Sequence, residues 1–413
     1  MTEHREVLIL GGGISGCTAA RFLRQPWLIL EKNSLPGGLS SQYRSQGFWF
    51  DFGGHYFHFK QSPEIRALLT SITQFNQYRR RSKVWLFQRM IPFPLQGHLE
   101  HLPSRYRRQI RAELAVPRDS IKDSLGENLR STFGPTLFEL FFSPFMTKYY
   151  RRDLNEMSRG MDKGSIPPPS TRNRQKASQN NQQGYNPEFF YPVGGLRRFW
   201  ASYAKPLSRG LRLEEPVMRV DLENRRVETN RRAYSFTWLI NTTPLPQFLS
   251  MLKGFPMDPE IPGCLRHSST RVTNMVLARR RRRFHWVYIP EKTTPYYRMG
   301  YYPASGTCKA YLEETMDPRH PRPSGNTDPA DILSRLGVIR EKGEIIHTSR
   351  ITIPVSYVQF DKAWFQTVPA LLERLRRNQV FSIGRYGSWN YTSMAVDARI
   401  ARECAEFINN RLA

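Results

Sequence analysis

A short apolar run followed by closely spaced glycines opens the chain and most constrains its fold. Residues Val7 to Leu10 are all aliphatic, which is typical of a strand buried on both faces of a sheet. Gly11, Gly13 and Gly16 follow at G-x-G-x-x-G spacing. The first glycine permits a tight turn, the second lets a pyrophosphate approach the backbone, and the third lets a helix pack on the strand. The sequence therefore predicts a Rossmann-like dinucleotide-binding unit, with the phosphates at the positive N-terminus of that helix.

An acidic residue stands where such a unit binds ribose. Glu31 ends the next apolar run, about twenty residues after Gly11, and a carboxylate at that distance accepts hydrogen bonds from the ribose of a dinucleotide. A ribose 2′-phosphate would be repelled by this carboxylate, so NADP is disfavoured. NAD and FAD are both compatible with these residues.

Two glycine pairs further along the chain favour FAD. Pro36-Gly-Gly38 comes soon after Glu31, and Phe50-Asp-Phe-Gly-Gly-His55 follows. These stretches resemble the two signatures that follow the dinucleotide motif in the flavoprotein family of UDP-galactopyranose mutase, amine oxidases and protoporphyrinogen oxidase. The resemblance implies FAD as cofactor, with the second glycine pair along the flavin ring and His55 positioning the flavin near its N5. Glycine pairs suit such close approach because they lack a Cβ atom.

Two later segments narrow the resemblance to UDP-galactopyranose mutase, especially its eukaryotic type. The first runs from Trp286 to Arg298 and the second from Gly384 to Tyr391. In that group the first segment supplies aromatic residues and an arginine to the substrate nucleotide and diphosphate. The second supplies an arginine and a tyrosine to the diphosphate beside the flavin. Two arginines would neutralise a diphosphate through forked, charge-assisted hydrogen bonds.

The same residues have plainer interpretations that the sequence leaves open. In a chain with 62 basic residues, Arg298 and Arg385 could be ordinary surface arginines. Trp286 and Tyr288 are two apart and share one face of a strand, where they could flank a base or form a buried sheet face.

The predicted site residues form three sets, and no metal site is predicted. The catalytic set is His55, Arg298 and Arg385. The resemblance and the glycine motifs imply an FAD-binding set of Gly11, Gly13, Ile14, Ser15, Gly16, Glu31, Lys32, Gly38, Leu39, Ser40, Gly53, Gly54, His55, Val217, Gly384, Arg385, Tyr391, Thr392 and Ser393. The substrate-binding set is Gln96, Asn186, Trp286, Tyr288, Arg298, Arg385 and Tyr391.

One segment departs from the family pattern. The mutases read roughly Pro-Tyr-Asn-x-Lys-x-Trp where this chain has Pro144-Phe-Met-Thr-Lys-Tyr-Tyr150. The tryptophan and arginine that the family places after Met-Ser are also absent near Met161 and Ser165. The family uses these positions around the uridine end of the substrate. Met146, Tyr150 and Ser165 therefore leave open whether the substrate is altered or the mutase activity is lost.

Composition sets outer bounds on partners and location. Against 62 basic residues stand 35 acidic ones, a net charge of +27 that attracts phosphorylated substrates, anionic lipid or nucleic acid. The four cysteines form no C-x-x-C pair, and the polar start at Met1 to Glu6 leaves no room for a signal peptide. We expect a cytoplasmic protein without a specific nucleic-acid partner; contact with an anionic membrane surface and the oligomeric state stay open.

The pattern along the chain predicts an α/β fold with three domains. Apolar residues at helical spacing, beginning with Ile121, predict helices over 119–150. Alternation over 270–315 predicts an antiparallel sheet, and 159–184 has no periodicity and is predicted as a mobile loop or lid. We expect a discontinuous Rossmann-like FAD-binding domain, an inserted helical domain, and an antiparallel β-sheet substrate domain. Their respective residues are 1–80 with 189–250 and 376–413, then 97–188, then 81–96 with 251–375.

The resemblance implies an FAD-dependent nucleotide-sugar mutase, an isomerase of cell-surface polysaccharide biosynthesis. In that chemistry reduced FAD interconverts pyranose and furanose forms through an adduct between flavin N5 and the sugar. The alternative is an FAD-dependent oxidoreductase of amine oxidase or desaturase type acting on another substrate. A third interpretation is a basic binding protein, because Arg279 to Arg283 form a run of five arginines and others cluster between Arg105 and Arg111.

Overall fold

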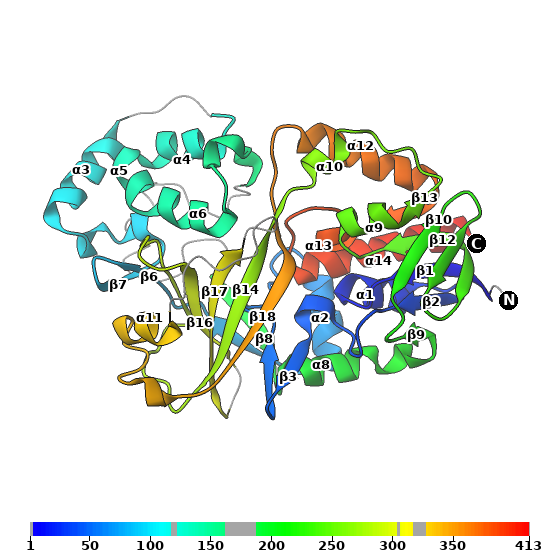
Figure 1. The fold of residues 1–413 in the computed structure, drawn as a ribbon, viewed down its shortest axis with the longest axis horizontal. Helices are drawn as coiled ribbons and strands as arrows, with labels where there is room; N and C mark the ends of the chain where they lie inside the picture. The colour runs from blue at the N-terminus through cyan, green and yellow to red at the C-terminus, as the bar shows by residue number, and fades with distance from the viewer. Residues whose placement is uncertain (1–2, 117–121, 162–186, 304–305, 317–327, 413) are drawn as a thin grey trace. The chain divides into compact units, whose positions relative to one another are not determined.

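The chain folds into two compact units, each assembled from separate stretches of sequence. The computed structural model describes residues 3–116, 122–161, 187–303, 306–316 and 328–412 (Figure 1). The first unit comprises residues 1–76, 190–266 and 363–413, and the second comprises 77–189 and 267–362. Asn186, Ser165 and most of the loop predicted at 159–184 lie outside the described residues.

The first unit is built on a sheet whose central strands are parallel. Its strand order is β13-β10-β11-β12-β1-β2-β9, and β19 also pairs with β12. Strand β1 runs parallel to β2 and to β12, whereas β10, β11 and β12 form an antiparallel meander. Val7 to Leu10 of β1 are fully buried, as their continuous apolar run predicts. A parallel core with helical crossovers is the Rossmann-like arrangement that the first glycine motif requires.

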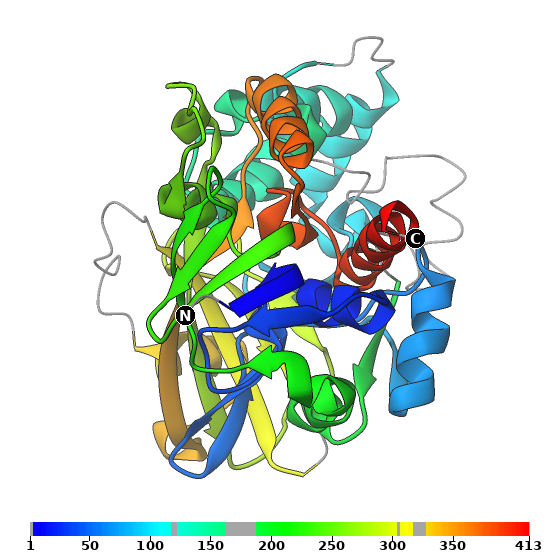
Figure 2. The same cartoon turned by 90° about the vertical axis from the view of Figure 1, so that its right-hand side faces the viewer.

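Two helices pack tightly against each other in this unit (Figures 1 and 2). Helix α1 follows β1 directly, and α14 is the last helix of the chain. Both helices carry small buried residues, such as Ala20 and Ala401. Asn409 of α14 then satisfies the C-terminal end of α1: its side chain accepts from Arg24 N at 2.9 Å and donates to Phe22 O at 2.8 Å. Cys17 of α1 is a buried free thiol.

The elements of the first unit have the following bounds. The strands are β1 (Glu3–Leu10), β2 (Trp27–Leu30), β3 (Gln42–Ser45), β4 (Phe48–Asp51), β9 (Leu211–Arg212), β10 (Val217–Asp221), β11 (Arg226–Thr229), β12 (Ala233–Asn241), β13 (Leu252–Lys253) and β19 (Val380–Ser382). The helices are α1 (Ile14–Phe22), α2 (Pro63–Ile72), α8 (Gly195–Ala204), α9 (Leu245–Met251), α10 (Ile261–Cys264), α12 (Trp364–Arg377), α13 (Gly384–Gly387) and α14 (Met394–Arg411). Strands β5 (Phe75–Arg79) and β8 (Glu188–Pro192) pair with each other, and the division between the units falls within both.

The second unit is built on a seven-stranded, mostly antiparallel sheet. The strand order is β18-β14-β17-β16-β15-β6-β7, and β6 with β15 is its parallel pair. The strands are β6 (Ser82–Leu86), β7 (Arg89–Pro92), β14 (His267–Leu277), β15 (Trp286–Tyr288), β16 (Tyr296–Tyr301), β17 (Cys308–Met316) and β18 (Ile345–Val358). The helices are α3 (Ser104–Ala115), α4 (Leu125–Phe133), α5 (Pro135–Leu137), a π-helical turn (Phe138–Phe142), α6 (Ser143–Tyr150) and α11 (Pro329–Arg335).

Helix α11 closes the main apolar core of this unit. Ile332 and Leu333 are buried in one cluster with Val287, Met299 and Leu312 of the sheet. Asp328 caps the helix by accepting from Ala330 N, and Pro329 occupies its first turn. Helix α6 contacts β16 and β17.

The predicted fold class is confirmed, and the division into domains differs from the prediction. The helical segment and the antiparallel sheet belong to one compact unit, and residues 251–266 and 363–375 belong to the dinucleotide-binding unit. The apolar stripe that begins at Ile121 is helical from Leu125, after the Ser124 cap that accepts from Glu127 N. None of the helices among the described residues is both long and apolar enough to cross a lipid bilayer.

The α11 core gives a direct test of this packing. Leu333→Ala should lower the free energy of unfolding by about 2–5 kcal/mol, because it leaves a cavity where a fully buried side chain packs. The neighbouring, exposed Ser334→Ala variant should stay close to the parent protein. Urea unfolding followed by tryptophan fluorescence measures both changes, and equal stability of the two variants would contradict the assignment of α11 to the core.

Candidate functional site

In the first unit, close backbone packing shapes the glycine turn after β1. Gly11 has φ of +100°, and a Cβ atom there would lie 2.5 Å from Thr242 Oγ1. A Cβ at Gly16 would lie 2.0 Å from the Gly11 carbonyl oxygen. The turn and the strand–helix contact therefore both exclude larger residues, as the motif predicts.

Gly13 differs from its two neighbours in the motif because it faces open space. It precedes Ile14, the first residue of α1, and has an ordinary φ of −77°. Apart from the two adjacent residues of the chain, no atom lies within 4 Å of a Cβ placed at this position. A second glycine, Gly38, comes close to this point, since a Cβ on Gly38 would lie 3.8 Å from Gly13 Cα. Glycine backbone therefore borders an open position at a helix N-terminus, which fits a pyrophosphate.

Glu31 is held against this turn. Its Oε2 accepts from Gly12 N at 2.7 Å, and its Oε1 accepts from the backbone and side chain of Asn33 at 2.8 and 2.7 Å. The Glu31 carbonyl accepts from Glu215 N at 2.9 Å, which brings the start of β10, with half-buried Val217, near this edge. Lys32 is exposed.

The segment Gly37–Ser40 also packs on the turn. Gly37 N donates to Gly12 O at 2.8 Å, and Gly37 has φ of +116°. Both the amide and the hydroxyl of Ser40 donate to Gly37 O, at 3.0 and 2.8 Å, and Trp200 Nε1 donates to Ser40 O at 2.7 Å. The predicted Gly38, Leu39 and Ser40 thus form one turn next to Gly13.

The second glycine pair forms a tight turn. Gly53 has φ of +110°, and His55 N donates to Gly53 O at 2.9 Å. The strand before this turn is anchored by buried Asp51, which accepts from Gln42 Nε2 at 2.5 Å and from Tyr191 OH at 2.8 Å. His55 and Gly54 are half-buried.

The segment Gly384–Ser393 lies beside α1 in the same unit. Gly384 has φ of +77°, and a Cβ there would lie 2.3 Å from Ser15 Oγ. The Arg385 guanidinium lies 4.2 Å from the centre of the Tyr391 ring, and its Nη1 donates to Thr392 O at 3.4 Å. The first unit therefore brings Arg385 and Tyr391 close to the glycine turn.

A buried carboxylate, which the sequence did not single out, supports this segment. Asp397 Oδ1 accepts from Thr392 Oγ1 at 2.6 Å, and the Ser393 hydroxyl caps α14 by accepting from Val396 N. Burial raises the pKa of Asp397 to about 6, although Thr392 and Arg385 act in the opposite direction. The only sequence signal for Asp397 is its place in the first turn of a helix that starts with a serine cap.

In the second unit, strand register brings Tyr288 and Arg298 together. They are direct partners in the antiparallel pair of β15 and β16, and Trp286 is opposite Gly300. Arg298 forms a bidentate pair with Glu313 on β17: its Nη2 donates to Oε1 at 2.8 Å and its Nε to Oε2. Burial is the largest single influence and opposes the charge on Arg298, but Glu313, Tyr357 and Tyr311 together outweigh it and raise the pKa of Arg298 well above its usual range. The sequence did not predict Glu313.

A β-bulge sets the direction of these side chains. The register shifts between Tyr296 and Arg298, so one extra residue, Tyr297, is inserted opposite β17. Tyr296 lies in the core cluster with α11, whereas Tyr297 contacts Tyr149 of α6 at 5.1 Å between ring centres. The bulge thus turns Arg298 toward the α6 side of the sheet.

The two predicted aromatic residues have different surroundings. Trp286 is 7% exposed and packs on Phe189, with 5.7 Å between ring centres. Tyr288 is half-buried and contacts Phe93 at 5.0 Å and Phe145 at 5.1 Å. The buried-face interpretation therefore describes Trp286 better than Tyr288.

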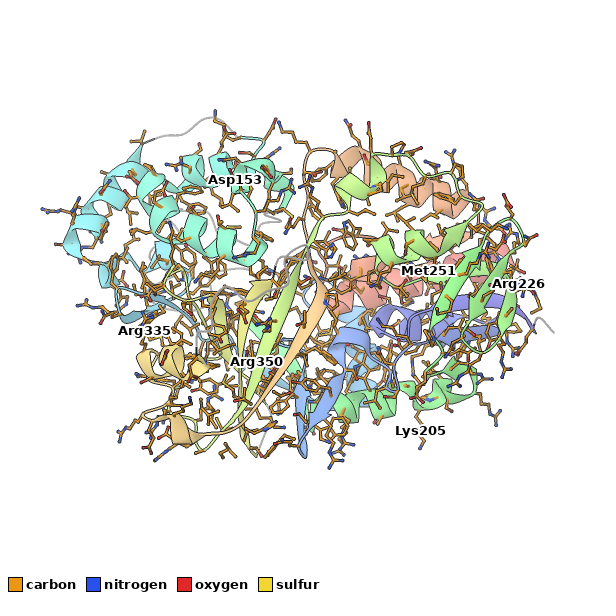
Figure 3. The ribbon with its side chains drawn as sticks, viewed as in Figure 1. Asp153, Lys205, Arg226, Met251, Arg335 and Arg350 are labelled. Atoms are coloured by element: carbon orange, nitrogen blue, oxygen red, sulfur yellow. The ribbon has the colours of Figure 1, made fainter. Side chains whose placement is uncertain are left out.

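Lys148 of α6 ties the helix to the loop between β15 and β16. Its Nζ donates to the carbonyl oxygens of Ile289, Glu291 and Tyr296 at 2.9, 2.6 and 3.1 Å. Burial lowers the pKa of Lys148 to about 7, although the negative charge of Glu291 acts in the opposite direction. Arg335, labelled in Figure 3, contacts the Glu291 side chain from α11. Lys148 matches the lysine of the Pro-Tyr-Asn-x-Lys-x-Trp pattern of the mutases. The sequence analysis gave this lysine no role.

The departures from the family pattern are buried. Met146, Tyr150 and Met161 are between 6% and 9% exposed. The Tyr150 carbonyl accepts from Gln359 Nε2 at 2.8 Å, and Met161 Sδ accepts from Phe360 N at 3.2 Å. Gln96, predicted on the substrate side, is half-buried in the 3₁₀ turn Leu95–Gly97.

A basic cavity of about 300 Å³ lies next to Phe93 and Tyr288 in the second unit. Phe93 lines it and also contacts Tyr288, and the Arg80 guanidinium lies 4.9 Å from the centre of the Phe93 ring. None of the described residues lining the cavity is acidic. They are Arg80, Arg81, Ser82, Lys83, Met90, Phe93, Arg282, Arg283 and Phe284.

The arginine run that reaches this cavity is tied into the fold. Arg281 forms a bidentate pair with Glu344, and its hydrogen bonds lower the pKa of Glu344 to about 2. Arg280 donates to Phe284 O at 2.7 Å, and Arg282 donates to Gly337 O at 3.1 Å. Arg280, Arg281 and Arg282 therefore make contacts within the fold as well as adding positive charge near the cavity.

Comparisons with known proteins agree with the fold. The family described as "NAD(P)-binding Rossmann-like domain" matches residues 9–72. The chain is similar to a structure of reduced UDP-galactopyranose mutase, with a TM-score of 0.89 and 22% identity over 99% of this chain and 96% of that chain.

The chain is also similar to two structures of oxidases. A putative protoporphyrinogen oxidase from Exiguobacterium sp. 255-15 has a TM-score of 0.75 at 17% identity, covering 100% and 99% of the chains. Cyclohexylamine oxidase from Brevibacterium oxydans IH-35A has a TM-score of 0.69 at 13% identity, covering 99% of each chain. The resemblance inferred from the motifs is thus confirmed at the level of the fold.

The open position at Gly13 separates ligand binding from folding. We expect Gly13→Ala to leave the stability of the cofactor-free protein unchanged and to weaken FAD binding by about tenfold or more, a loss of about 1.4 kcal/mol, because its methyl group occupies the space beside the pyrophosphate. Gly263→Ala is the matched control, because a Cβ there also meets nothing within 4 Å. Reconstitution of stripped protein, followed by flavin fluorescence, measures the affinity; equal FAD affinity in the two variants would contradict this site.

His285 gives a pH-dependent test of the second unit. Burial, and then Arg280 and Arg81, lower its pKa to about 4, and its Nδ1 accepts from Arg81 N at 3.0 Å. This pKa is below that of an unfolded histidine, so the unfolded state binds the proton more readily and stability is lost as pH falls from about 6.5 to 4. His285→Asn should reduce this slope by up to about 1.4 kcal/mol per pH unit. Urea unfolding across this range measures it, with exposed His4→Asn as control; equal slopes for all three proteins would refute it.

Proposed function

We propose that this chain is an FAD-dependent nucleotide-sugar mutase that interconverts pyranose and furanose forms of a sugar attached to a nucleoside diphosphate. The observation that carries the proposal is the basic cavity in the second unit, with five cationic side chains along its wall and Tyr288 and Arg298 close by. A nucleoside diphosphate brings two negative charges and an aromatic base, and this combination of cations and rings suits both.

The glycine turns of the first unit support FAD as the proposed cofactor. The Gly13 position, Glu31 and the turn Gly37–Ser40 would hold the dinucleotide, and Gly53 with Gly54 would pass along the flavin. Reduced FAD supplies the nucleophile that exchanges places with the nucleoside diphosphate at the anomeric carbon of the sugar. His55, on the turn after Gly53, would position the flavin.

The arginines would retain the leaving group. Arg298 keeps the two N–H groups of Nη1, which donate to no described residue, while Glu313 fixes its Nε and Nη2. Arg385 is oriented by Tyr391 and Thr392 in the first unit. Fixed donors of this kind hold a diphosphate for its return to the sugar without reorganising during the reaction.

The charge of the second unit favours a mutase over the oxidase alternative. An amine or polyene substrate would gain nothing from a cavity lined by five cations and no described acid. An amine would be repelled by them, because like charges at short range disfavour binding. Similarity to oxidases at 13–17% identity concerns the fold and gives their substrates no weight here.

Conversion of a nucleotide sugar tests the proposal. Protein reduced anaerobically with dithionite should convert UDP-galactofuranose into UDP-galactopyranose, and the same protein left oxidised should not, because only reduced flavin is nucleophilic. Anion-exchange chromatography separates the two sugars from each other. Lack of conversion by reduced protein that has retained its FAD would exclude UDP-galactose as substrate.

Arginine variants test the diphosphate contact separately. Arg385→Ala should slow conversion by about 10²–10³-fold, as expected when a fixed electrostatic contact to the leaving group is removed. Arg399→Ala, which removes an arginine of an exposed i,i+4 ion pair in α14, is the control and should convert normally. Flavin absorbance reports whether each variant keeps its cofactor. An Arg385→Ala variant that binds FAD and converts at the parental rate would show that the arginine has no such role.

A further inference from the structure

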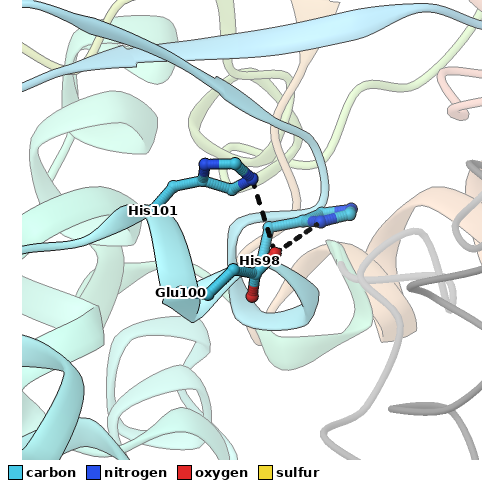
Figure 4. A group of neighbouring side chains, drawn as sticks. All are labelled: His98, Glu100 and His101. Carbon is cyan, nitrogen blue, oxygen red and sulfur yellow. Dashed lines mark ion pairs between the residues drawn. The ribbon is translucent and has the colours of Figure 1, made fainter.

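Three potential metal ligands converge in the second unit, and none of them has been assigned a role above. Figure 4 shows His98, Glu100 and His101 with their side chains directed toward one another. One ligand atom from each lies within 4.8 Å of the others. The sequence analysis had predicted no metal site, because it found no histidine and cysteine cluster with the usual zinc spacing.

The local backbone explains how so short a segment gathers three ligands. His98 lies between two 3₁₀ turns, Leu95–Gly97 and Leu99–His101. Residues three apart eclipse each other in a 3₁₀ helix, so the two histidines fall on the same side. The backbone bond from His101 N to His98 O, at 3.2 Å, closes that turn. Glu100 then folds its carboxylate between the rings.

The distances suit a tetrahedral ion better than hydrogen bonds. His98 Nδ1 and His101 Nε2 lie 3.5 and 3.4 Å from the same atom, Glu100 Oε1. These separations exceed the 2.7–3.2 Å that is usual for a hydrogen bond between nitrogen and oxygen. In a tetrahedral zinc site, ligand atoms that are each about 2.0–2.1 Å from the ion are roughly 3.3 Å apart. The two distances from Glu100 Oε1 to the histidine nitrogens are within a few tenths of an ångström of that value.

The surroundings allow an ion to enter and select its type. The His98 side chain is 9% exposed, while those of His101 and Glu100 are 48% and 57% exposed, so one ligand is fixed and the open side faces solvent. Two imidazoles and one carboxylate favour zinc and its late transition-metal neighbours, whereas magnesium and calcium prefer oxygen ligands. Lys83 is near enough to act on His98 electrostatically, and Arg107 contacts the Glu100 carbonyl at 3.4 Å, so nearby positive charge opposes any cation.

We propose that His98, Glu100 and His101 form a Zn²⁺ site, in which the three side chains supply Nδ1, a carboxylate oxygen and Nε2 and water supplies the fourth ligand. The site does not depend on the proposed mutase activity. A bound ion would hold the turn Leu99–His101 closed through His98 and His101, within the segment 95–102. That segment includes Gln96, so the ion would also hold the turn on which this predicted substrate-side residue lies.

Metal titration of the full, tag-free chain tests the site. Co²⁺ should bind with the intense visible absorption of a tetrahedral ion, and Zn²⁺ should displace it at one equivalent, whereas Mg²⁺ and Ca²⁺ should not. His101→Ala and Glu100→Gln alter exposed side chains and should each weaken Zn²⁺ binding by roughly 100-fold or more, beyond the loss typical of an outer-shell partner. The control His4→Ala removes an exposed histidine that also has a glutamate nearby, Glu6 at 3.8 Å, and should bind like the parent protein.

Hydrogen exchange gives a second readout that does not depend on spectra. Zn²⁺ should slow exchange of the amides of His98, His101 and Leu102, which close the two turns, and should not do so in Glu100→Gln. Unchanged Zn²⁺ affinity in both ligand variants would overturn the proposal. So would a sulfur-to-cobalt charge-transfer band, because it would assign the ion to a cysteine such as half-buried Cys308.

Discussion

The hydrogen bond from Gly12 N to Glu31 holds the dinucleotide-binding turn, and the rest of the first unit is arranged around it. Because Glu31 fixes the turn from the end of β2, the glycines on either side can pack at backbone contact, with Gly16 against the Gly11 carbonyl. Gly37 then adds its own bond to Gly12 O, and Gly384 packs against Ser15 at the start of α1. Three stretches from the first forty residues and a fourth from near the C-terminus thereby meet at one helix N-terminus. Without the carboxylate, the Gly12 amide would lose a buried charge-assisted bond, which contributes about 1.5–3 kcal/mol.

The second unit depends on buried charges that are satisfied within the fold. Glu313 is 3% exposed, so its pairing with Arg298 avoids an isolated buried carboxylate and at the same time fixes the direction of the guanidinium. Removing one partner of such a pair usually costs about 3–5 kcal/mol, because the other charge stays buried. Lys148 acts similarly through three carbonyl oxygens and holds the loop between the strands of Tyr288 and Arg298. Stability and the proposed binding role therefore rest on the same residues.

Sequence reasoning succeeded where the signal is local. The strand–glycine–helix motif, the acid after β2 and the apolar stripe of α4 depend on neighbouring residues and were predicted from them. Pairing between distant segments was not accessible in that way. Glu313 is fifteen residues from Arg298 and meets it only through strand register, and the cavity joins residues near 80 with others near 282. The merging of the helical segment with the antiparallel sheet likewise depends on Lys148 and on aromatic contacts of α6, which no periodicity in the sequence specifies.

Positional isotope exchange tests the central claim most directly, because the claim is that a nucleoside diphosphate leaves the sugar and returns. UDP-galactopyranose carrying ¹⁸O in the bond between the anomeric carbon and the β-phosphate would be incubated with the reduced protein. The UDP-galactopyranose that remains would then be recovered and the position of its label determined. The account predicts that the label redistributes to the non-bridging oxygens of the β-phosphate, as seen by ³¹P NMR, and that oxidised protein causes no redistribution. Retention of the label by reduced, FAD-containing protein would contradict it.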